Sequence, residues 1–384
     1  MPRVDSVSWL PAGIRYEDEI PTPFVDSWGA QLFVKVSLSD GSVGWGEVLA
    51  YGSSIVDAYA GVLEDVVAPA ARGEQLDGVG RLRELLSRLE RLLFTAGLCG
   101  VVNGALGGFE MAALDALARS SRSPLWSLLG ASSRSEIPVY ASLPRYSRPD
   151  DAVRAVERAV GWGFTMVKLH QPPGEALEYV RAVREAVGYD VDLALDLNGG
   201  LAREAALELA NSLARYELEW IEEPVWPVDD RESLAWLASR SPIPVAAGEN
   251  EHSLRGLLEL ARAGVKVVQP DISKLGGALK LLEAARALTK EGAIVAPHLR
   301  PHRSFLAHAF VLHVAAVEPD LGPVEWPSGP LAYDAFDAPR LEVRGGLLDA
   351  SPLLGSAGVG VAVREEVVAS RYRYSKAFRP LVFH

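Results

Sequence analysis

A strand followed by a helix recurs from residue 137 to residue 326, and this repeat constrains the fold more than any other feature. Short, strongly apolar segments alternate with amphipathic segments of helical period. Strands this apolar, separated by helices, indicate a parallel sheet that is buried on both faces. Eight such units of about 25 residues predict a closed (β/α) barrel. The predicted strands are Val139–Leu143, Thr165–His170, Asp192–Asn198, Glu219–Glu223, Val245–Glu249, Val265–Asp271, Ala293–His298 and Val324–Trp326. The clearest helical patterns between them are Asp151–Val160, Gly174–Val187, Ala202–Tyr216, Gly276–Glu291 and Ser304–Val317.

Ionisable residues stand at the ends of seven of these strands, with nearly constant separations of 22 to 28 residues from Lys168 onward. A constant period places each residue at an equivalent depth in its own unit. The carboxyl ends of barrel strands form one face, where catalytic residues gather. We therefore expect these side chains to converge on one point. They are Lys168, His170, Asp196, Glu222, Glu249, Asp271, His298 and Glu325.

Three of these residues, Asp196, Glu222 and Glu249, are acids on consecutive strands. Carboxylates that converge in an apolar barrel mouth repel one another, which raises their pKa values unless a cation neutralises them. Oxygen ligands favour a hard ion such as Mg²⁺. The alternative is that each acid pairs with a neighbouring Lys or Arg. Asn198 follows Asp196 by two residues, so on a strand both side chains would point to the same side, and Asn198 is a candidate substrate ligand.

Asp271 and His298 end the next two strands. A carboxylate that accepts a hydrogen bond from an imidazole fixes its tautomer and raises its pKa, which makes a competent general base. The alternative is a structural histidine with satisfied hydrogen bonds. Lys168 and His170 share one strand face across the barrel from His298. One of them is a candidate acid or base, and the other a candidate partner for a bound carboxylate; the alternative is a solvated strand end.

The remaining candidates are less specific. Glu325 either acts on a substrate oxygen or caps a helix, and Lys274 is a candidate partner of a metal-binding carboxylate within the substrate site. Arg300, His302 and Arg303 form a basic loop that either holds an anionic substrate or is simply solvated. Three aromatic residues of an N-terminal loop either cover the barrel mouth or belong to the core. They are Tyr16, Phe24 and Trp28.

The N-terminal third has a different pattern. Residues 32–38 and 43–48 are β-rich and are joined by a short loop that contains Asp40 and Gly41, which predicts a hairpin. Residues 53–130 have helical periodicity, so this third is α+β. The regular repeat stops after Trp326, and we expect the tail to pack back on the N-terminal third. The predicted domains are residues 1–131, 132–326 and 327–384.

Composition excludes several classes of protein. The formal net charge of −12 argues against a general binder of nucleic acid or of a membrane surface, because both need basic patches. Cys99 is the single cysteine, which fits a reducing compartment. The absence of a run of 18 apolar residues argues against a membrane span, and the N-terminus lacks the apolar core of a signal peptide. We therefore expect a cytoplasmic protein.

Taken together, these motifs resemble the enolase superfamily, in particular its mandelate racemase-like group. The resemblance covers nearly the whole chain and rests on six ordered barrel motifs. It implies an α/β fold: a modified TIM barrel, (β/α)7β, with an α+β capping domain that the C-terminal segment completes. The barrel motifs are Lys168-x-His170, Asp196-x-Asn198, Glu222-Glu223-Pro224, Gly248-Glu249-Asn250, Asp271 through Gly277, and His298, and those of the N-terminal third are Gly44-Trp45-Gly46-Glu47 and Glu110 through Gly130.

The resemblance also implies chemistry. It implies Mg²⁺ on Asp196, Glu222 and Glu249, removal of a proton α to a carboxylate, and an enediolate stabilised by the metal. His170 stands where the family has Lys or His, and an imidazole delivers a proton near neutral pH better than Lys does. We therefore expect dehydration of an acid sugar, an aldonate or aldarate, to a 2-keto-3-deoxy acid. Racemisation or epimerisation and cycloisomerisation are the alternatives through the same intermediate.

Two further interpretations leave the three acids unexplained. Lys168 as the nucleophile of a Schiff-base aldolase would make the protein insensitive to EDTA. A barrel retained only for binding would tolerate substitution of His298. The family resemblance also implies a homo-oligomer.

Overall fold

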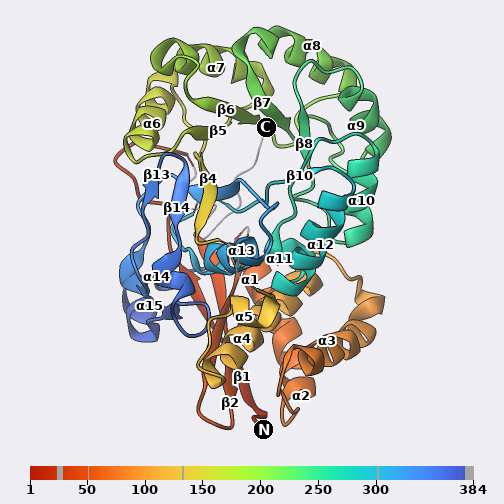
Figure 1. The fold of residues 1–384 in the computed structure, drawn as a ribbon, viewed down its shortest axis with the longest axis vertical. Coiled ribbons are helices and arrows are strands. Elements are labelled where there is room, and N and C mark those ends of the chain that lie inside the picture. The colour runs from red at the N-terminus through yellow and green to blue at the C-terminus, as the bar shows by residue number, and fades with distance from the viewer. Residues whose placement is uncertain (24–28, 51, 132–133, 301, 377–384) are drawn as a thin grey trace.

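The computed structural model describes residues 1–23, 29–50, 52–131, 134–300 and 302–376. Within these residues, eight parallel strands form the barrel in the upper part of Figure 1. Strand β11 pairs with β4, and a parallel bridge from Val295 to Leu321 joins β10 to the segment before β11, so the sheet closes. The strands are β4 (Glu136–Ser142), β5 (Met166–His170), β6 (Asp192–Asp196), β7 (Leu218–Glu222), β8 (Val245–Ala247), β9 (Val267–Val268), β10 (Ile294–Val295) and β11 (Val324–Pro327).

Seven helices connect consecutive barrel strands, so the predicted (β/α)7β order is confirmed. Their inner faces bury small and branched apolar residues against the sheet, as the amphipathic pattern requires. The connecting helices are α6 (Pro149–Gly161), α7 (Pro173–Val187), α8 (Arg203–Leu213), α9 (Arg231–Ala238), α10 (Leu254–Arg262), α12 (Ala278–Lys290) and α13 (Leu306–Val317), with short helices η3 (Ala214–Tyr216) and α11 (Ile272–Leu275) beside them.

Several strands end earlier than their apolar patterns predict. The ladder of β8 stops at Ala247, because Gly248 turns the backbone with φ of 127°. Glu249, Asp271 and His298 therefore lie just beyond the strands. Asn198 is also outside β6, and its φ of 48° places it in the left-handed region. The prediction that Asp196 and Asn198 belong to one strand is therefore wrong, because β6 ends at Asp196.

The barrel interior beneath the carboxyl ends of the strands is filled with side chains. Tyr140, Met166 and Trp220 pack with small residues from the intervening strands, and the rings of Tyr140 and Trp220 meet edge to face at 5.5 Å. This layer of side chains fills the interior of the barrel below the strand ends. Within the barrel, a ligand can therefore bind only at the face above this layer.

The N-terminal residues form a three-stranded antiparallel sheet that packs on a long helix, α4. Gly44 and Gly46 of the G-W-G-E motif allow this close approach. A Cβ atom on Gly44 would lie 2.1 Å from the Ala116 backbone nitrogen. The predicted hairpin is confirmed as β2 and β3. The elements are β1 (Val4–Gly13), β2 (Ala30–Leu38), β3 (Val43–Ala50), α1 (Ser53–Val62), η1 (Leu63–Val67), α2 (Ala68–Ala71), α3 (Val79–Leu93), η2 (Phe94–Ala96), α4 (Gly100–Ser120) and α5 (Trp126–Leu129).

Helix α4 is long and apolar enough to cross a membrane by length and composition, the one such helix among the described residues. However, 94% of its apolar window is buried inside the molecule. It contacts β2, β3, α1 and α3 on different sides. A helix that is apolar all round is expected in such a position, so core packing accounts for its composition.

The C-terminal segment contacts both other parts of the molecule. Strand β14 pairs with the first residues of β4, while α15 contacts β1 and the Tyr372 carbonyl accepts a hydrogen bond from the Gly13 amide. In Figure 1 this blue segment runs from the barrel towards the red strands. Its elements are η4 (Tyr333–Ala335), β12 (Phe336–Asp337), β13 (Val343–Arg344), β14 (Leu347–Asp349), α14 (Ser351–Leu354), β15 (Ala362–Val363) and α15 (Glu365–Arg371).

Two buried carboxylates of the capping domain hold it over the carboxyl-terminal face of the barrel. Glu110 accepts hydrogen bonds from the Ala278 and Leu279 amides at the start of α12, and Glu47 accepts one from the Ala307 amide at the start of α13. Helix N-termini present unpaired N–H groups and partial positive charge. Helices α12 and α13 follow β9 and β10 in the chain and begin on the side of the barrel where these strands end. These contacts therefore fix the cap above the strand ends.

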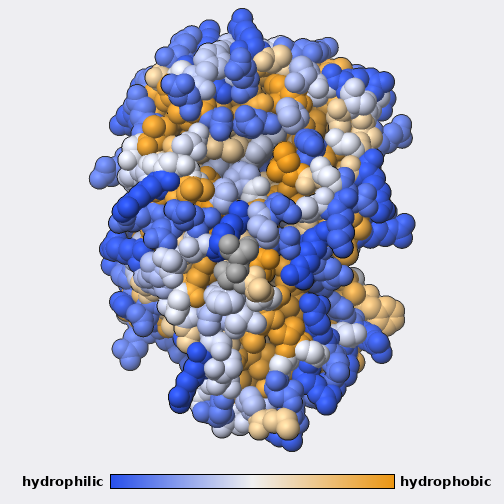
Figure 2. All heavy atoms as spheres, in the orientation of Figure 1, coloured by the Kyte–Doolittle hydropathy of each residue, from blue (hydrophilic) through white to orange (hydrophobic). Residues whose placement is uncertain are grey.

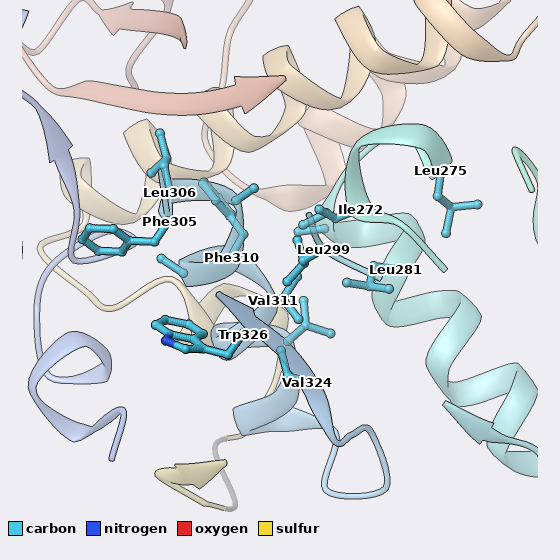
Figure 3. Packing of buried hydrophobic residues seen from close by; sticks show 14 of the residues in the cluster. Ile272, Leu275, Leu281, Leu299, Phe305, Leu306, Phe310, Val311, Val324 and Trp326 are labelled. Atoms are coloured by element: carbon cyan, nitrogen blue, oxygen red, sulfur yellow. The ribbon is translucent and has the colours of Figure 1, made fainter. Parts of the chain in front are cut away.

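Hydrophilic side chains cover most of the face in Figure 2, with hydrophobic residues between them. Behind the strand ends, Figure 3 shows Phe310 and Val311 of α13 beside Trp326 and Val324 of β11. All four side chains are buried. This packing gives the polar residues above it a rigid support.

Candidate active site

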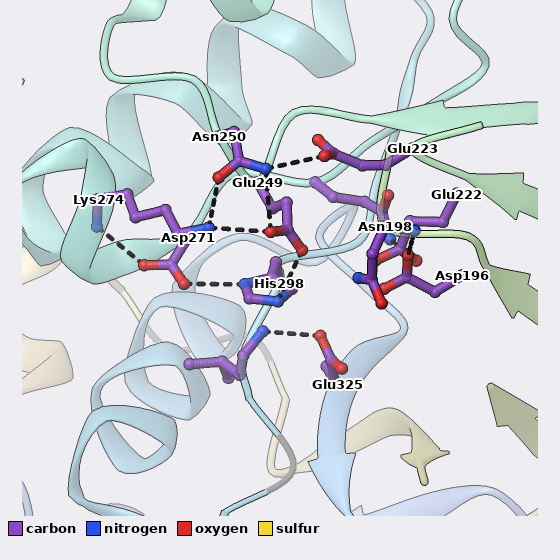
Figure 4. A network of polar contacts seen from close by, with 12 residues as sticks. Asp196, Asn198, Glu222, Glu223, Glu249, Asn250, Asp271, Lys274, His298 and Glu325 are labelled. Carbon is purple, nitrogen blue, oxygen red and sulfur yellow. Dashed lines mark hydrogen bonds and ion pairs between the residues drawn. The ribbon is translucent and has the colours of Figure 1, made fainter. Parts of the chain in front are cut away.

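Asp196, Glu222 and Glu249 meet at the carboxyl-terminal face, as the sequence spacing predicts. Asp196 ends β6, Glu222 ends β7 and Glu249 follows β8. One oxygen from each lies within 4.8 Å of the other two, and all three side chains are buried (Figure 4). Burial raises the pKa of Glu222 and raises that of Asp196 to about 6, with the nearby Lys168 charge opposing both shifts.

A divalent cation fits this group of acids. The donors are carboxylate oxygens, which hard ions such as Mg²⁺ prefer. Burying like charges together is unfavourable, and a bound cation would remove that cost. Because these oxygens already lie close together, little rearrangement is needed to hold an ion among them.

Glu222 has two hydrogen-bond donors that the sequence analysis did not identify. Gln269 Nε2 and Trp220 Nε1 lie 2.6 and 3.1 Å from Glu222 Oε2, while Lys168 Nζ donates to Oε1 at 2.6 Å. The sequence does contain a signal for both donors. Trp220 precedes Glu222 by two residues, and Gln269 precedes Asp271 by two. On a strand, that spacing places both members of a pair on one face.

His298 lies between two carboxylates. Its Nδ1 is 2.8 Å from Asp271 Oδ2, and its Nε2 is 2.9 Å from Glu249 Oε2. Burial lowers the pKa of His298, but the charges of Glu249 and Glu325 and the bond to Asp271 outweigh it and hold the pKa well above its ordinary value. Burial also raises the pKa of Asp271, yet the bond to His298 brings it down to about 2. Asp271 is thus an ionised partner that orients the imidazole.

Lys168 and His170 lie on β5, on the other side of the three acids. Lys168 Nζ contacts Glu222, Glu325 at 3.1 Å and Asp196 at 3.8 Å. Burial lowers its pKa, but these carboxylates outweigh burial and raise it well above its ordinary value. His170 Nε2 is 3.1 Å from Asp196 Oδ2. Burial and the Lys168 charge lower the pKa of His170 to about 4.

Glu325 and Lys274 connect the residues at the strand ends to the segments around them. Glu325 accepts a hydrogen bond from the Leu299 amide at 2.8 Å, which fixes the segment just after His298. Lys274 Nζ donates to Glu249 Oε1 at 2.9 Å. Burial raises the pKa of Glu249, but His298 and Lys274 outweigh it and hold the pKa well below its ordinary value. Lys274 therefore pairs with one of the three acids that are predicted to hold a metal ion.

Hydrogen bonds of Asn198 and Asn250 connect the loops that follow β6, β7 and β8 to the acids of the site. The Asn198 amide donates to Asp196 Oδ1 at 2.8 Å, so this residue supports the Asp196 carboxylate through its backbone. Asn250 Nδ2 joins Glu223 Oε2 and Glu249 Oε1 at 2.8 and 3.1 Å. Burial raises the pKa of Glu223 well above its ordinary value.

The basic loop after β10 is buried under the cap and is not a solvated segment. His302 Nδ1 is 2.7 Å from the Arg300 carbonyl, and its ring lies 5.3 Å from that of His308. Arg300 is near Asp271, and its charge contributes to the low pKa of that carboxyl. Arg303 Nη1 donates to Glu17 at 2.7 Å.

The predicted aromatic cover is only partly described. Tyr16 is buried and donates a hydrogen bond to Asp18 at 3.1 Å, next to the Asp18–Arg158 ion pair. This packing is that of a core residue, and substrate contact by Tyr16 stays a prediction. Phe24 and Trp28 lie outside the described residues.

A (β/α)7β barrel under a cap, with three acids facing a His–Asp pair across from a lysine, is the arrangement of enolase-type enzymes. The family model described as enolase C-terminal domain-like matches residues 151–367. The model for the N-terminal domain of mandelate racemase / muconate lactonizing enzyme matches residues 21–130. The chain therefore belongs to the mandelate racemase / muconate lactonizing enzyme family of the enolase superfamily.

Individual relatives share between 25% and 30% of their residues with this chain. D-galactarolactone cycloisomerase of Agrobacterium fabrum is 29% identical over 80% of this chain and 83% of its own length. D-galactonate dehydratase of Klebsiella pneumoniae is 30% identical over 74% of each chain. A solved enolase from Bradyrhizobium, complexed with magnesium and mandelic acid, is 25% identical with a TM-score of 0.82, over 97% of this chain and 99% of that one.

Proposed function

We propose that this chain is a Mg²⁺-dependent dehydratase that converts an acid sugar into a 2-keto-3-deoxy acid. The observation that carries the proposal is the placement of His298–Asp271 and of Lys168 on opposite sides of three acids that can hold one cation. The similarity to a galactonate dehydratase supports this reaction type. The small carboxylate in the Bradyrhizobium enzyme supports the substrate class.

Mg²⁺ held by Asp196, Glu222 and Glu249 would supply the positive charge that makes a proton α to a carboxylate acidic enough to remove. Asp271 accepts a hydrogen bond from Nδ1–H of His298 and so orients the imidazole. Once Nε2 is unprotonated, it is the base that takes the α-proton. Lys168, with its raised pKa, remains a cation that offsets negative charge on the substrate. The β-hydroxyl then leaves as water after it receives the proton from His298, because the lowered pKa of His170 leaves that imidazole unprotonated near neutral pH.

Racemisation or epimerisation and cycloisomerisation begin with the same proton removal. The similarity to a galactarolactone cycloisomerase makes cycloisomerisation the second candidate. In that reaction an oxygen of the substrate itself takes part, and no hydroxide is lost. Dehydration and cycloisomerisation would use the same residues for the first proton removal and would differ only in their products.

The test is a screen of aldonic and aldaric acids with the purified protein and Mg²⁺, assayed for 2-keto acid as a semicarbazone. We expect formation of a keto acid that is abolished by EDTA and by His298→Asn. His252→Asn, a change outside the proposed catalytic groups, is the matched control. Proton exchange in D₂O without keto acid would contradict dehydration and favour the isomerases. Borohydride trapping of substrate on Lys168 would contradict the whole proposal.

We also propose the division of the chain into residues 1–131, 132–326 and 327–384. The end of the N-terminal family match at residue 130 and the start of β4 at Glu136 support the first boundary. The start of β12 at Phe336, beyond the last barrel strand, supports the second.

A further inference from the structure

One face of helix α4 in the cap contacts the segment that runs from α11 to the start of α12. Asn103, Gly107 and Glu110 share this face, because residues four and three positions apart lie together on a helix. A Cβ atom on Gly107 would lie 3.0 Å from the carbonyl carbon of Gly276, so the two backbones meet with little room for a side chain. The cap therefore touches a segment that also carries Lys274, a residue of the barrel mouth.

Asn103 makes a polar contact at the start of this face. Its side chain is buried, and Nδ2 donates to the His252 carbonyl at 3.0 Å and to the Lys274 carbonyl at 3.1 Å. The first carbonyl belongs to the loop after β8 and the second to α11, so one amide ties both to the cap. Asn103 Oδ1 has no hydrogen-bond partner among the described residues, which is unfavourable for a buried acceptor. An apolar side chain would avoid that cost, so packing alone does not account for the amide.

Lys274 transmits this contact to the three acids. Its backbone amide donates to Asp271 Oδ1 at 2.8 Å, while its carbonyl is held by Asn103. Its Nζ donates to Glu249 Oε1 at 2.9 Å and to Asn250 Oδ1 at 2.8 Å (Figure 4). The ammonium of a lysine stands on a flexible four-carbon stem. It can hold the Glu249 carboxylate in one direction only if the backbone from which the stem starts is fixed.

We propose that Asn103 is a positioning residue for the magnesium site, because it fixes the backbone of Lys274, whose ammonium orients the Glu249 carboxylate. The inference rests on the metal-dependent function proposed above. Groups behind a metal ligand fix its direction and so contribute to metal affinity. A residue of the capping domain thereby takes part in setting the affinity of the barrel for Mg²⁺.

Isothermal titration of metal-free protein with Mg²⁺ compares wild type with Asn103→Ala and Asn103→Leu. Alanine removes both hydrogen bonds, and leucine removes them while nearly keeping the volume. The dissociation constant should rise about 10-fold in both variants, at the lower end of the effects of residues behind a metal ligand. Lys274→Met alone should raise it at least as much. In the Lys274→Met background, Asn103→Ala should change it less than about twofold, because the connection to Glu249 is already absent.

Glu110→Ala is the matched control. It removes two buried hydrogen bonds from the same face of α4, but these bonds reach α12 and not Lys274. It should change the Mg²⁺ dissociation constant less than about twofold, although it lowers the stability of the fold. If Asn103→Ala and Glu110→Ala weaken Mg²⁺ binding equally, the effect is a general loosening of the cap and the proposal is overturned.

The proposal also fails if both Asn103 variants bind Mg²⁺ as wild type does, or if Asn103→Ala costs the same with and without Lys274. A Lys274→Met protein with wild-type or higher affinity for Mg²⁺ would overturn it even where the Asn103 variants do not fold. Each of these results leaves the dehydratase function standing. A wild-type protein that binds no Mg²⁺ would instead remove the metal-dependent function together with this proposal.

Discussion

The carboxylate of Glu222 is bonded on both oxygens before any ligand arrives. Lys168 holds one oxygen, and Gln269 and Trp220 hold the other. Each bond fixes the direction of the carboxylate and offsets part of the cost of burying its charge. Oε2 accepts two of these bonds and Oε1 only one, so Oε1 keeps a lone pair for a cation. Glu222, a proposed metal ligand, is therefore positioned by residues outside the three acids.

Gln269→Leu should weaken Mg²⁺ binding about 10- to 100-fold, because loss of a partner behind a metal ligand usually has effects of that size. Isothermal titration of the metal-free protein with Mg²⁺ measures this directly. Trp220→Phe, which removes only the indole N–H, should weaken binding in the same direction. Gln75→Leu, in the capping domain, is the control. Unchanged Mg²⁺ affinity in both site variants would show that Glu222 holds its orientation without them.

At the scale of elements, helices α12 and α13 depend on the cap for their first turns. Glu110 on α4 supplies both oxygens to two amides of α12. Asp115, on the same helix, accepts from the Trp45 and Val359 amides, one in β3 and one in the C-terminal segment. Helix α4 thus joins the cap sheet, the barrel and the C-terminal segment.

Glu110→Ala should lower the free energy of unfolding by about 2 to 3 kcal/mol, because two buried N–H groups of α12 lose their acceptor. Urea unfolding followed by circular dichroism measures the change. Glu84→Ala, an exposed residue paired with Arg81, should change stability by less than about 0.5 kcal/mol. A loss for Glu110→Ala no larger than that of the control would mean that α12 needs no cap from α4.

His313 on α13 gives the fold a pH dependence. Its Nδ1 accepts from the Trp126 amide at 3.1 Å and its Nε2 donates to the Val359 carbonyl at 3.2 Å, so it is neutral. Burial lowers its pKa to about 3 from an ordinary 6.5. The unfolded chain therefore binds this proton first, and the contribution to stability is lost as pH falls from 6.5 towards 3.

Between pH 6.5 and 4.5 this loss should be about 2 to 3 kcal/mol for His313 alone, at 1.36 kcal/mol per pH unit. Other groups titrate in the same range, so the measurement is the difference between wild type and His313→Gln in urea unfolding at the two pH values. The variant should lose less stability on acidification than wild type. Parallel pH profiles for the two proteins would contradict the depressed pKa.

At the scale of the whole molecule, the three acids come from consecutive strands of a closed barrel. A cation bound among them would therefore link β6, β7 and the loop after β8. Folding brings these like charges together at a cost, which a bound cation removes. Metal binding and folding are thus coupled, because the separated acids of the unfolded chain form no such site.

Mg²⁺ at about 100 times its dissociation constant should raise the free energy of unfolding by about 2.7 kcal/mol, and EDTA should reverse the effect. Scanning calorimetry with and without Mg²⁺ measures the shift in Tm. The variant Glu222→Gln should show a smaller shift, whereas Glu219→Gln, which changes an exposed acid on the same strand, should behave as wild type. The same Tm in Mg²⁺ and in EDTA would contradict a metal site in the folded protein.

The sequence alone determined the barrel and the residues that converge on its mouth. An apolar repeat of about 25 residues is best buried by strands and helices in alternation, and the strand ends in such a sheet share one face. Asp196, Glu222, Glu249, Asp271 and His298 could therefore be placed together without coordinates. The family resemblance added the cap and the expected chemistry.

Tertiary structure decided what depends on contacts between distant segments or on local departures from the strand period. The left-handed backbone of Asn198 lies beyond the end of β6, and Gly248 ends β8 before Glu249, because backbone dihedrals are not set by the apolar period. The bond of Gln269 to Glu222 and the cap of Glu110 on α12 join residues far apart in sequence. Such pairs become neighbours only after the barrel closes and the cap docks, so no periodicity predicts them.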